Sequence, residues 1–174
     1  MTENFTVSTV DDVVLLERVR AFLYREARLL DDREFDAWLE CYHPDARFWM
    51  PAWDDNDELT EDPQSEISLI YYDNRGGLED RVFRIKTDRS SATSLPDPRT
   101  GHNITDLEVL ARDGDTVHVR FNWFTLYFRY NTTDTYFGTS HYVIDLSGDR
   151  PLIRDKKVVL KNDYIRHVVD VYMI

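Results

Sequence analysis

The feature that most constrains the fold is a change in hydrophobic period at His102, after which apolar and polar residues alternate along most of the chain. Alternation of this kind is typical of β-strands with one buried face. Asp113-Gly114 separates two alternating runs and predicts a tight hairpin turn. Two further runs, 133–146 and 151–163, are separated by the turn sequence SGDR. Together the runs predict a long antiparallel meander.

The run after the hairpin turn changes the phase of its alternation. Its apolar residues occupy odd positions from Val117 to Trp123 and even positions from Phe124 to Tyr130. A strand can change phase in this way through a β-bulge, which inserts one extra residue and bends the strand. We therefore expect a bulge and a bent strand near Trp123.

The beginning of the chain has the helical period instead. Apolar residues recur at steps of three and four within residues 8–32, which predicts a long amphipathic helix. Ser8 or Thr9 is a suitable cap for its first turn. A second, shorter helix is predicted within 31–42, with Asp32 as a plausible cap.

The segment between the second helix and the meander contains two more predicted elements. Residues 47–53, RFWMPAW, are expected to form a strand that Pro51 ends, and an acidic loop without periodicity follows. Residues 76–87, GGLEDRVFRIKT, predict a short helix that follows Gly76-Gly77. The residues that share its apolar face are Leu78, Val82 and Ile85.

Helices followed by a meander predict an α+β fold, in which N-terminal helices pack on one face of a strongly curved antiparallel sheet. Such a domain is cone-shaped. No internal repeat or linker divides the chain, so residues 1–174 are expected to form a single domain with a flexible N-terminal tail at 1–8.

The charge and the cysteine count exclude several classes of function. A formal net charge of −12 argues against a nucleic-acid or an anionic-membrane partner, because both reward positive charge. Neither a signal peptide nor an apolar run of membrane-spanning length is visible. Cys41 is the only cysteine, so no internal disulfide can form, which fits a reducing cytoplasm.

The five histidines do not form a recognisable metal motif, because none is paired with another at a helical spacing. A Rieske cluster needs two cysteines and two histidines, and the chain has one cysteine. A mononuclear iron site would require two dispersed histidines and a carboxylate to converge in the fold. We therefore assign no metal, cofactor or catalytic residue to this chain.

A cone-shaped domain with an aromatic interior can nevertheless hold a general acid/base pocket. The residues that we nominate for such a pocket, should the chain be an enzyme by itself, are Tyr24, Asp31, His102 and His141. A histidine that is satisfied by a neighbouring carboxylate or backbone group is the structural alternative to a catalytic one, and we favour it for His141.

The stretch at 71–93 is rich in arginine in an otherwise acidic chain. It is a poor phosphate site, because Glu79 and Asp80 in the first turn of the predicted helix would repel an anion. Asp80 and Arg84 are spaced for an ion pair on that helix. Four arginines lack an obvious local partner and are candidates for a subunit interface: Arg75, Arg81, Arg89 and Arg99.

Several segments give the chain a family likeness: FLYREARLLDDREFDAWLECY, FWMPAW, LIYYDNRGGLEDRVFRIKT, GHNI and KKVVLKNDYIRHVVDVYMI. Over about residues 12–174 the chain resembles the small (beta) subunit of aromatic ring-hydroxylating dioxygenases, in the branch that includes benzoate and toluate 1,2-dioxygenases. The resemblance implies a cone-like fold similar to nuclear transport factor 2 (NTF2) and scytalone dehydratase.

The resemblance also implies a structural, non-catalytic role in a complex. The large alpha subunit would carry the Rieske [2Fe-2S] cluster and the mononuclear Fe(II), and a separate reductase would supply electrons from NADH. The expected assembly is an α3β3 hexamer with contacts between beta subunits. Aromatic residues at 128–130 and the apolar tail at 168–174 are candidates for part of the beta–beta surface.

Two other functions are weighed against this one. The first is a free-standing lyase or isomerase of the NTF2-like fold that uses Asp31 and a histidine as acid and base. The second is a ligand-binding or dimerisation module.

Overall fold

The computed structural model describes residues 10–87, 96–162, 165 and 168–174. The predicted N-terminal tail, the cap residues Ser8 and Thr9, and Arg89 lie outside these ranges. The helices are α1 (Val10–Asp31), α2 (Phe35–Leu39), α3 (Arg75–Lys86) and the short 3₁₀ helix η1 (Val171–Met173). The strands are β1 (Tyr42–Pro51), β2 (Ser68–Tyr72), β3 (Arg99–Asp113), β4 (Thr116–Arg129), β5 (Thr132–Asp145) and β6 (Leu152–Leu160).

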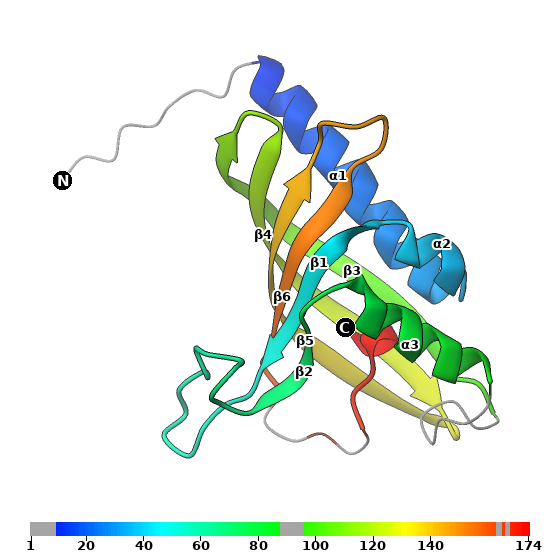
Figure 1. Cartoon of the computed structure of the whole chain (residues 1–174). Helices are drawn as coiled ribbons and strands as arrows, with labels where there is room; N and C mark the ends of the chain where they lie inside the picture. Colours follow the sequence, from blue (N-terminus) through cyan, green and yellow to red (C-terminus); the bar gives the residue numbers. More distant parts are fainter. Residues whose placement is uncertain (1–9, 88–95, 163–164, 166–167) are drawn as a thin grey trace.

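Six strands form one sheet in the order β2-β1-β6-β5-β4-β3. The meander from β3 to β6 pairs antiparallel, as the alternation predicts. The pairing of β1 with β6 is parallel, so the sheet is mixed rather than fully antiparallel. Figure 1 shows the helices on one side of the twisted sheet. The predicted α+β architecture is confirmed, and none of the described helices is long and apolar enough to span a membrane.

The long helix α1 packs its apolar stripe on the sheet. Val19, Leu23 and Leu30 are almost completely buried, and Asp11 and Asp12 lie in the first turn, where the helix dipole favours negative charge. The core that these residues join contains the inner faces of the strands and of the other two helices. A long helix over most of residues 8–32 is therefore confirmed.

The second helix is shorter than predicted, and Asp32 does not cap it. Arg33 has a positive φ of 61°, which breaks the helical path after α1 and leaves Glu34 at the N-cap without a side-chain cap bond. The helix then ends at Leu39, and Tyr42 already belongs to β1. The apolar residues between 35 and 42 are therefore divided between a helix and a strand. Periodicity alone does not locate the boundary between the two.

The third helix begins at Arg75, so it includes the glycine pair Gly76-Gly77, which the prediction placed just before it. The Asn74 side chain accepts a hydrogen bond from the Gly76 backbone N–H and caps the first turn. Leu78, Val82 and Ile85 are buried, as their spacing predicts. The i,i+4 ion pair of this helix joins Arg75 to Glu79, and no ion pair joins Asp80 to Arg84 within the described residues.

The predicted bulge near Trp123 is wrong. Strands β4 and β5 pair residue for residue from Thr116 to Arg129, and the odd positions remain buried along the whole of β4. The irregularities lie on the neighbouring strand β3, where the register shifts between Thr105 and Glu108 and Asp106 has a positive φ of 51°. The apolar residues at even positions after Trp123 therefore face outward.

The apolar tail is also placed differently from the prediction. The residues from Val171 to Ile174 are buried in the core instead of forming an exposed surface. Asp170, which is buried, caps η1 and binds Arg81 of α3 through both carboxylate oxygens. The end of the chain is therefore a structural part of the domain, although Val168 just before it is exposed.

Candidate functional site

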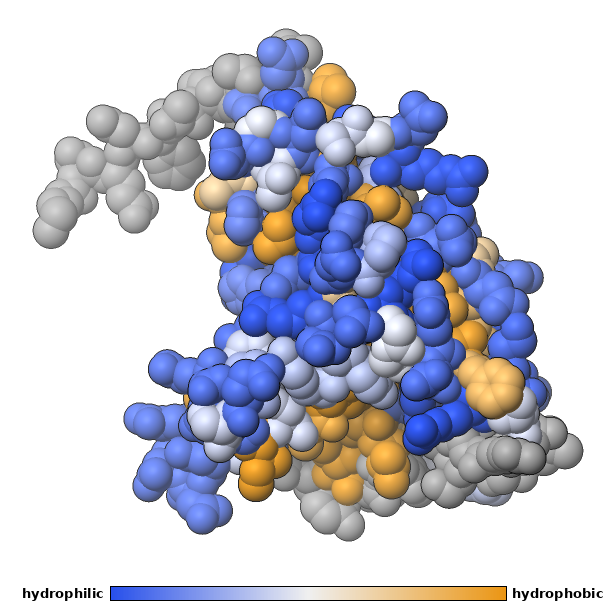
Figure 2. All heavy atoms as spheres, viewed as in Figure 1, coloured by the Kyte–Doolittle hydropathy of each residue, from blue (hydrophilic) through white to orange (hydrophobic). Residues whose placement is uncertain are grey.

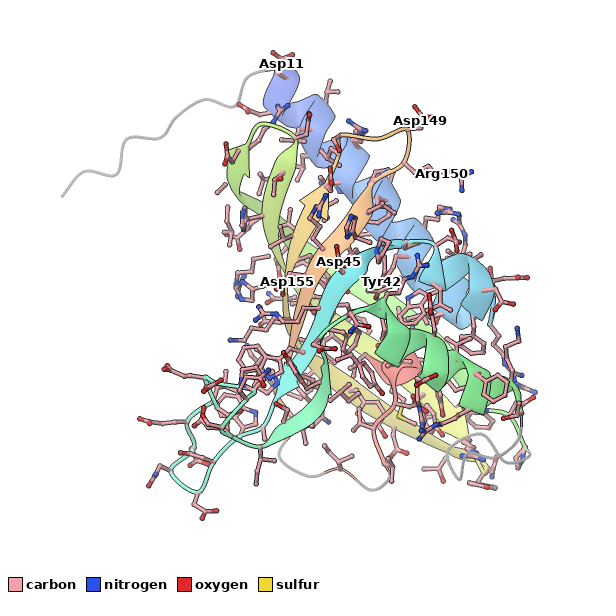
Figure 3. The ribbon with its side chains drawn as sticks, in the orientation of Figure 1. Asp11, Tyr42, Asp45, Asp149, Arg150 and Asp155 are labelled. Carbon is pink, nitrogen blue, oxygen red and sulfur yellow. The ribbon has the colours of Figure 1, made fainter. Side chains whose placement is uncertain are left out.

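The centre of the domain is occupied by a closed polar network. One oxygen of Glu26, Oε1, accepts hydrogen bonds from Trp38 Nε1 and Tyr42 Oη, both over 2.8 Å, and from Lys156 Nζ over 3.1 Å. Figure 3 shows Tyr42 at the start of β1, beside the helices. Because the buried carboxylate is paired with a buried ammonium and two further donors, this network is a structural clamp from α1 to β1 and β6.

The pKa of Glu26 reflects this pairing. Burial by itself raises the pKa of the carboxyl group, but the charge of Lys156 and the three hydrogen bonds outweigh burial and hold the pKa below its usual value. The carboxylate is therefore ionised and engaged at neutral pH. A general base must reach its substrate, and Glu26 is poorly placed for this because it is buried in the core.

Three of the four residues predicted for an acid/base pocket line one groove. Tyr24 and Asp31 on α1 face His102 on β3 across a surface groove of about 450 Å³. His141 lies elsewhere, exposed on β5, where the cross-strand pairing sets it beside Arg120 and Lys157. Burial, together with the charges of those two residues, lowers the pKa of His141. The set of four therefore does not converge.

Asp31 and His102 form a tightly bonded pair at the wall of the groove. Asp31 Oδ1 lies 2.6 Å from His102 Nδ1 and accepts a bond from Thr100 Oγ1 over 2.9 Å. The other oxygen, Oδ2, accepts the His102 backbone N–H over 3.0 Å. Burial raises the pKa of Asp31, but the hydrogen bonds and charge of His102 and the Thr100 bond more than offset it, so the pKa lies below its usual value.

The geometry of this pair favours a structural role. Both oxygens of Asp31 are used to hold the end of α1 against the edge strand β3. The second ring nitrogen of His102, Nε2, is buried and has no hydrogen-bond partner in the described part of the chain. Since an acid/base histidine must reach its substrate, an enclosed Nε2 is poorly placed for catalysis.

The described side chains do not form a recognisable metal site. No group of three histidine, cysteine, aspartate or glutamate side chains within the described ranges is arranged to hold an ion. The single cysteine, Cys41, is buried, and burial beside Glu26 raises its thiol pKa to about 12. Such a thiol stays protonated at neutral pH and is a poor thiolate ligand. The residues present therefore do not fit a Rieske cluster.

The outward side of β4 and β5 carries a row of exposed apolar side chains. On β4 and the turn after it, the alternate residues point away from the helices, and Phe137 of β5 is the cross-strand partner of the first of them. We call this set the outer strip: Phe124, Leu126, Phe128, Tyr130 and Phe137. The residues between them, such as Tyr127, are buried, so this part of β4 is apolar on both faces. A strand of this kind is typical of a sheet that is covered on both sides.

The surface carries both hydrophilic and hydrophobic side chains. Figure 2 shows one face of the molecule, on which hydrophilic side chains surround smaller hydrophobic patches. Large apolar side chains that stay exposed together usually mark a protein interface. The outer strip, including Phe128 and Tyr130 of the predicted 128–130 surface, is such a set.

Two of the four candidate interface arginines have partners inside the domain. Arg75 binds Glu79 over 2.8 Å and donates to the Tyr42 carbonyl, and Arg81 binds Asp170. The expectation of no local partner is wrong for Arg75, which pairs with Glu79 at i+4. The partner of Arg81 lies 89 residues away in sequence, where no local pattern reports it. Arg89 lies outside the described residues.

Arg99 is the candidate that lies at an exposed apolar surface. Its guanidinium group stacks over the ring of Phe128 at 5.9 Å from the centroid, beside the outer strip. Sequence reasoning missed a second set of arginines on α1, and among these Arg28 is exposed and forms no ion pair within the described residues. The sequence gives no signal for this, because Asp31 and Asp32 stand at the i+3 and i+4 positions where an ion pair with Arg28 would be expected.

Comparison with protein families gives a match to the model described as "Ring hydroxylating beta subunit", over residues 25–167. The benzoate 1,2-dioxygenase subunit beta of Acinetobacter baylyi is 64% identical over 163 residues, 94% of this chain and 96% of that protein. The toluate 1,2-dioxygenase subunit beta of Pseudomonas putida is 64% identical over 156 residues, 90% of this chain and 96% of that protein.

Solved structures agree with the fold. The beta subunit of the benzoate 1,2-dioxygenase from Burkholderia mallei superposes with a TM-score of 0.78, at 55% identity, over 98% of this chain and 100% of that one. A chain of naphthalene 1,2-dioxygenase superposes with a TM-score of 0.73 at 18% identity, over 97% of this chain and 88% of that one, which supports the fold alone. The NTF2-like α+β fold implied by the resemblance is therefore confirmed.

Proposed function

Because the chain belongs to the family of ring-hydroxylating dioxygenase beta subunits, we propose that it acts on benzoate or a substituted benzoate only through a partner. It is the small, non-catalytic subunit of a multicomponent oxidoreductase, and its role is to support assembly of the catalytic large subunits. The observation that carries this assignment is 64% identity over nearly the full length to the beta subunits of a benzoate and a toluate 1,2-dioxygenase.

The redox centres belong to the partners in this proposal. The large alpha subunit carries a Rieske [2Fe-2S] cluster and a mononuclear Fe(II), and a separate reductase passes electrons from NADH. The single cysteine and the absence of a three-ligand group in the described residues support this division of labour. A single domain over residues 1–174 and a cytoplasmic location are parts of the same proposal.

The expected complex is an α3β3 hexamer. An NTF2-like domain contributes to it through surfaces rather than through a pocket. The outer strip supplies apolar area, and Arg99 at its border supplies a planar cation that is suited to interfaces. We assign this surface to subunit contacts. Arg75 and Arg81 act indirectly, because they hold α3 and the C-terminal segment in place.

A free-standing lyase or isomerase is not favoured. Its candidate base, Asp31, uses both oxygens in bonds to β3, and His141 lies away from the groove. The central carboxylate, Glu26, is engaged by Lys156 and two further donors.

The test is co-purification with the large subunit encoded by the same organism. We compare Leu126→Asp in the outer strip with Leu110→Asp on β3, because the two leucines have similar exposures of 46% and 53%. A charge in a covered apolar strip must be desolvated, so Leu126→Asp should abolish recovery of the complex, whereas Leu110→Asp should leave it intact. Equal recovery of both variants would exclude the outer strip, and failure of the unmodified chain to bind would exclude the proposed function.

A further inference from the structure

The groove between α1 and β3 exposes an arginine that the domain itself does not neutralise. Arg28 lies on the groove wall, is exposed, and forms no ion pair with any described residue. The chain has 33 acidic and 21 basic residues, so carboxylates are in excess. An arginine that stays unpaired in such a chain has its charge available for another molecule.

Two carboxylates, Asp31 and Asp32, are spaced for an ion pair with Arg28, and among the described residues neither forms one with it. Asp31 follows three residues later and lines the same groove, but its oxygens accept three hydrogen bonds from Thr100 and His102 of β3. These bonds engage both oxygens of Asp31 with β3. The Asp31–His102 pair thus fixes the groove wall and leaves Arg28 as its free cation.

A second free hydrogen-bonding group lies one helical turn away. Tyr24 precedes Arg28 by four residues, so the two side chains lie on the same face of α1, and Tyr24 is about half exposed. The rest of the wall is mixed, with the apolar residues Ala27, Ile104 and Phe124 and the polar residues Asn103 and Thr105. The groove therefore combines a guanidinium group and a phenol with a lining that is partly apolar.

The groove is continuous with the outer strip. Phe124 lines the groove and is also a member of the strip, so the two surfaces meet at the edge strand β3. A partner that covers the strip can therefore reach the groove past Phe124. The Asp31 bond to the His102 backbone N–H also blocks part of the free edge of β3, which disfavours the addition of a strand there.

We propose that this groove receives a carboxylate-bearing side chain from the large subunit, which pairs with Arg28 and accepts a hydrogen bond from Tyr24. This inference rests on the proposed function and names the chemistry of the contact. Arginine binds carboxylates in a bidentate geometry, and arginine and tyrosine are the residues that most often anchor interfaces. An acidic partner side chain is the complement of an unpaired guanidinium group.

The test measures the dissociation constant between the full-length chain and the separately purified large subunit, at low and at moderate salt. Arg28→Ala should raise the dissociation constant by about tenfold or more, and Tyr24→Phe should raise it by a smaller factor. The control is Arg84→Ala, which removes the same charge from an exposed position on α3 and should change little. Circular dichroism of each free variant establishes that it is folded.

Salt provides the second readout. Moderate salt weakens a charge pair, so the difference between the unmodified chain and Arg28→Ala should shrink as salt rises. Equal dissociation constants for Arg28→Ala and Arg84→Ala would overturn the inference while the proposed function stands. An Arg28→Ala effect on self-association of the chain alone, without an effect on large-subunit binding, would also overturn it. An unmodified chain that binds no large subunit would overturn the proposed function and this inference together.

Discussion

Arg81 on α3 binds Asp170 near the end of the chain through two hydrogen bonds, one of them from Nε to Oδ1 over 2.8 Å. Asp170 is 1% exposed and also accepts the Val171 backbone N–H, so it connects α3 to the buried C-terminal residues. The ion pair therefore holds α3 against the segment that leads into the buried residues 171–174.

Removal of this pair should destabilise the domain. Arg81→Ala leaves the Asp170 carboxylate buried without its counter-ion, and breaking a buried pair in this way costs about 3–5 kcal/mol. Urea unfolding of the isolated chain measures the loss. Arg84→Ala, an exposed change on the same helix, should alter the free energy of unfolding by less than about 0.5 kcal/mol. Equal stabilities of the two variants would contradict the role of the pair.

The Glu26–Lys156 pair gives a prediction that depends on comparing single and double variants. Lys156→Met should cost about 3–5 kcal/mol, because it leaves the Glu26 carboxylate buried with only two neutral donors. Adding Glu26→Gln should recover part of that loss, since the uncompensated charge is then removed. A double variant that is less stable than Lys156→Met, as seen by thermal or urea unfolding, would contradict this reading of the network.

The lowered pKa of Asp31 predicts that the stability of the domain depends on pH in the acid range. The pKa of Asp31 in the folded chain lies below the ordinary value of 3.8, so the carboxylate binds fewer protons when folded than when unfolded. Its contribution is therefore complete above pH 3.8 and is lost as the pH falls through the lowered pKa. The difference in unfolding free energy between the unmodified chain and Asp31→Asn should shrink over this acid range. A difference that is constant from neutral to acid pH would contradict the bonding of Asp31 to His102.

Gly138 on β5 offers a steric test of the sheet. A methyl group at this position would lie 1.9 Å from the Val159 carbonyl oxygen, so the backbone of β6 would have to shift. Gly138→Ala should therefore destabilise the chain by about 1–3 kcal/mol, the usual cost of overpacking. Gly101→Ala on β3 is the matched control, because nothing lies within 4 Å of its added atom. A larger loss at Gly101 than at Gly138 would contradict the pairing of β5 with β6.

The elements with a clear period could be predicted from the sequence, and the reason is physical. Helix α1 has one apolar face, and so do the strands from β3 to β6 outside the part of β4 that carries the outer strip, so periodicity reports these elements directly. The phase change at Trp123 misled the prediction, because alternation locates the buried face only when the outer face is polar. The outer face of β4 is itself apolar there, and that surface carries the proposed interface.

Contacts between residues far apart in the sequence could not be predicted from local sequence patterns. The parallel pairing of β1 with β6 joins segments more than 100 residues apart, and the partner of Arg81 lies in the C-terminal segment. Sequence reasoning correctly grouped Asp31 with His102, but it could not show that their hydrogen bonds leave Asp31 fully engaged. It also could not show that His141 faces the opposite side of the sheet from that pair.

The most direct test of a non-catalytic role is the turnover of benzoate or a substituted benzoate per assembled, iron-loaded complex. The complexes contain the unmodified chain, His141→Ala, or the double variant Asp31→Asn/His102→Gln. We predict that total activity falls only as far as assembly falls, so that turnover per complex stays within about twofold of the unmodified value, because no group of this chain takes part in the chemistry. A fully assembled, iron-loaded complex whose turnover drops by about a hundredfold or more would contradict this prediction and would make the chain part of the catalytic machinery.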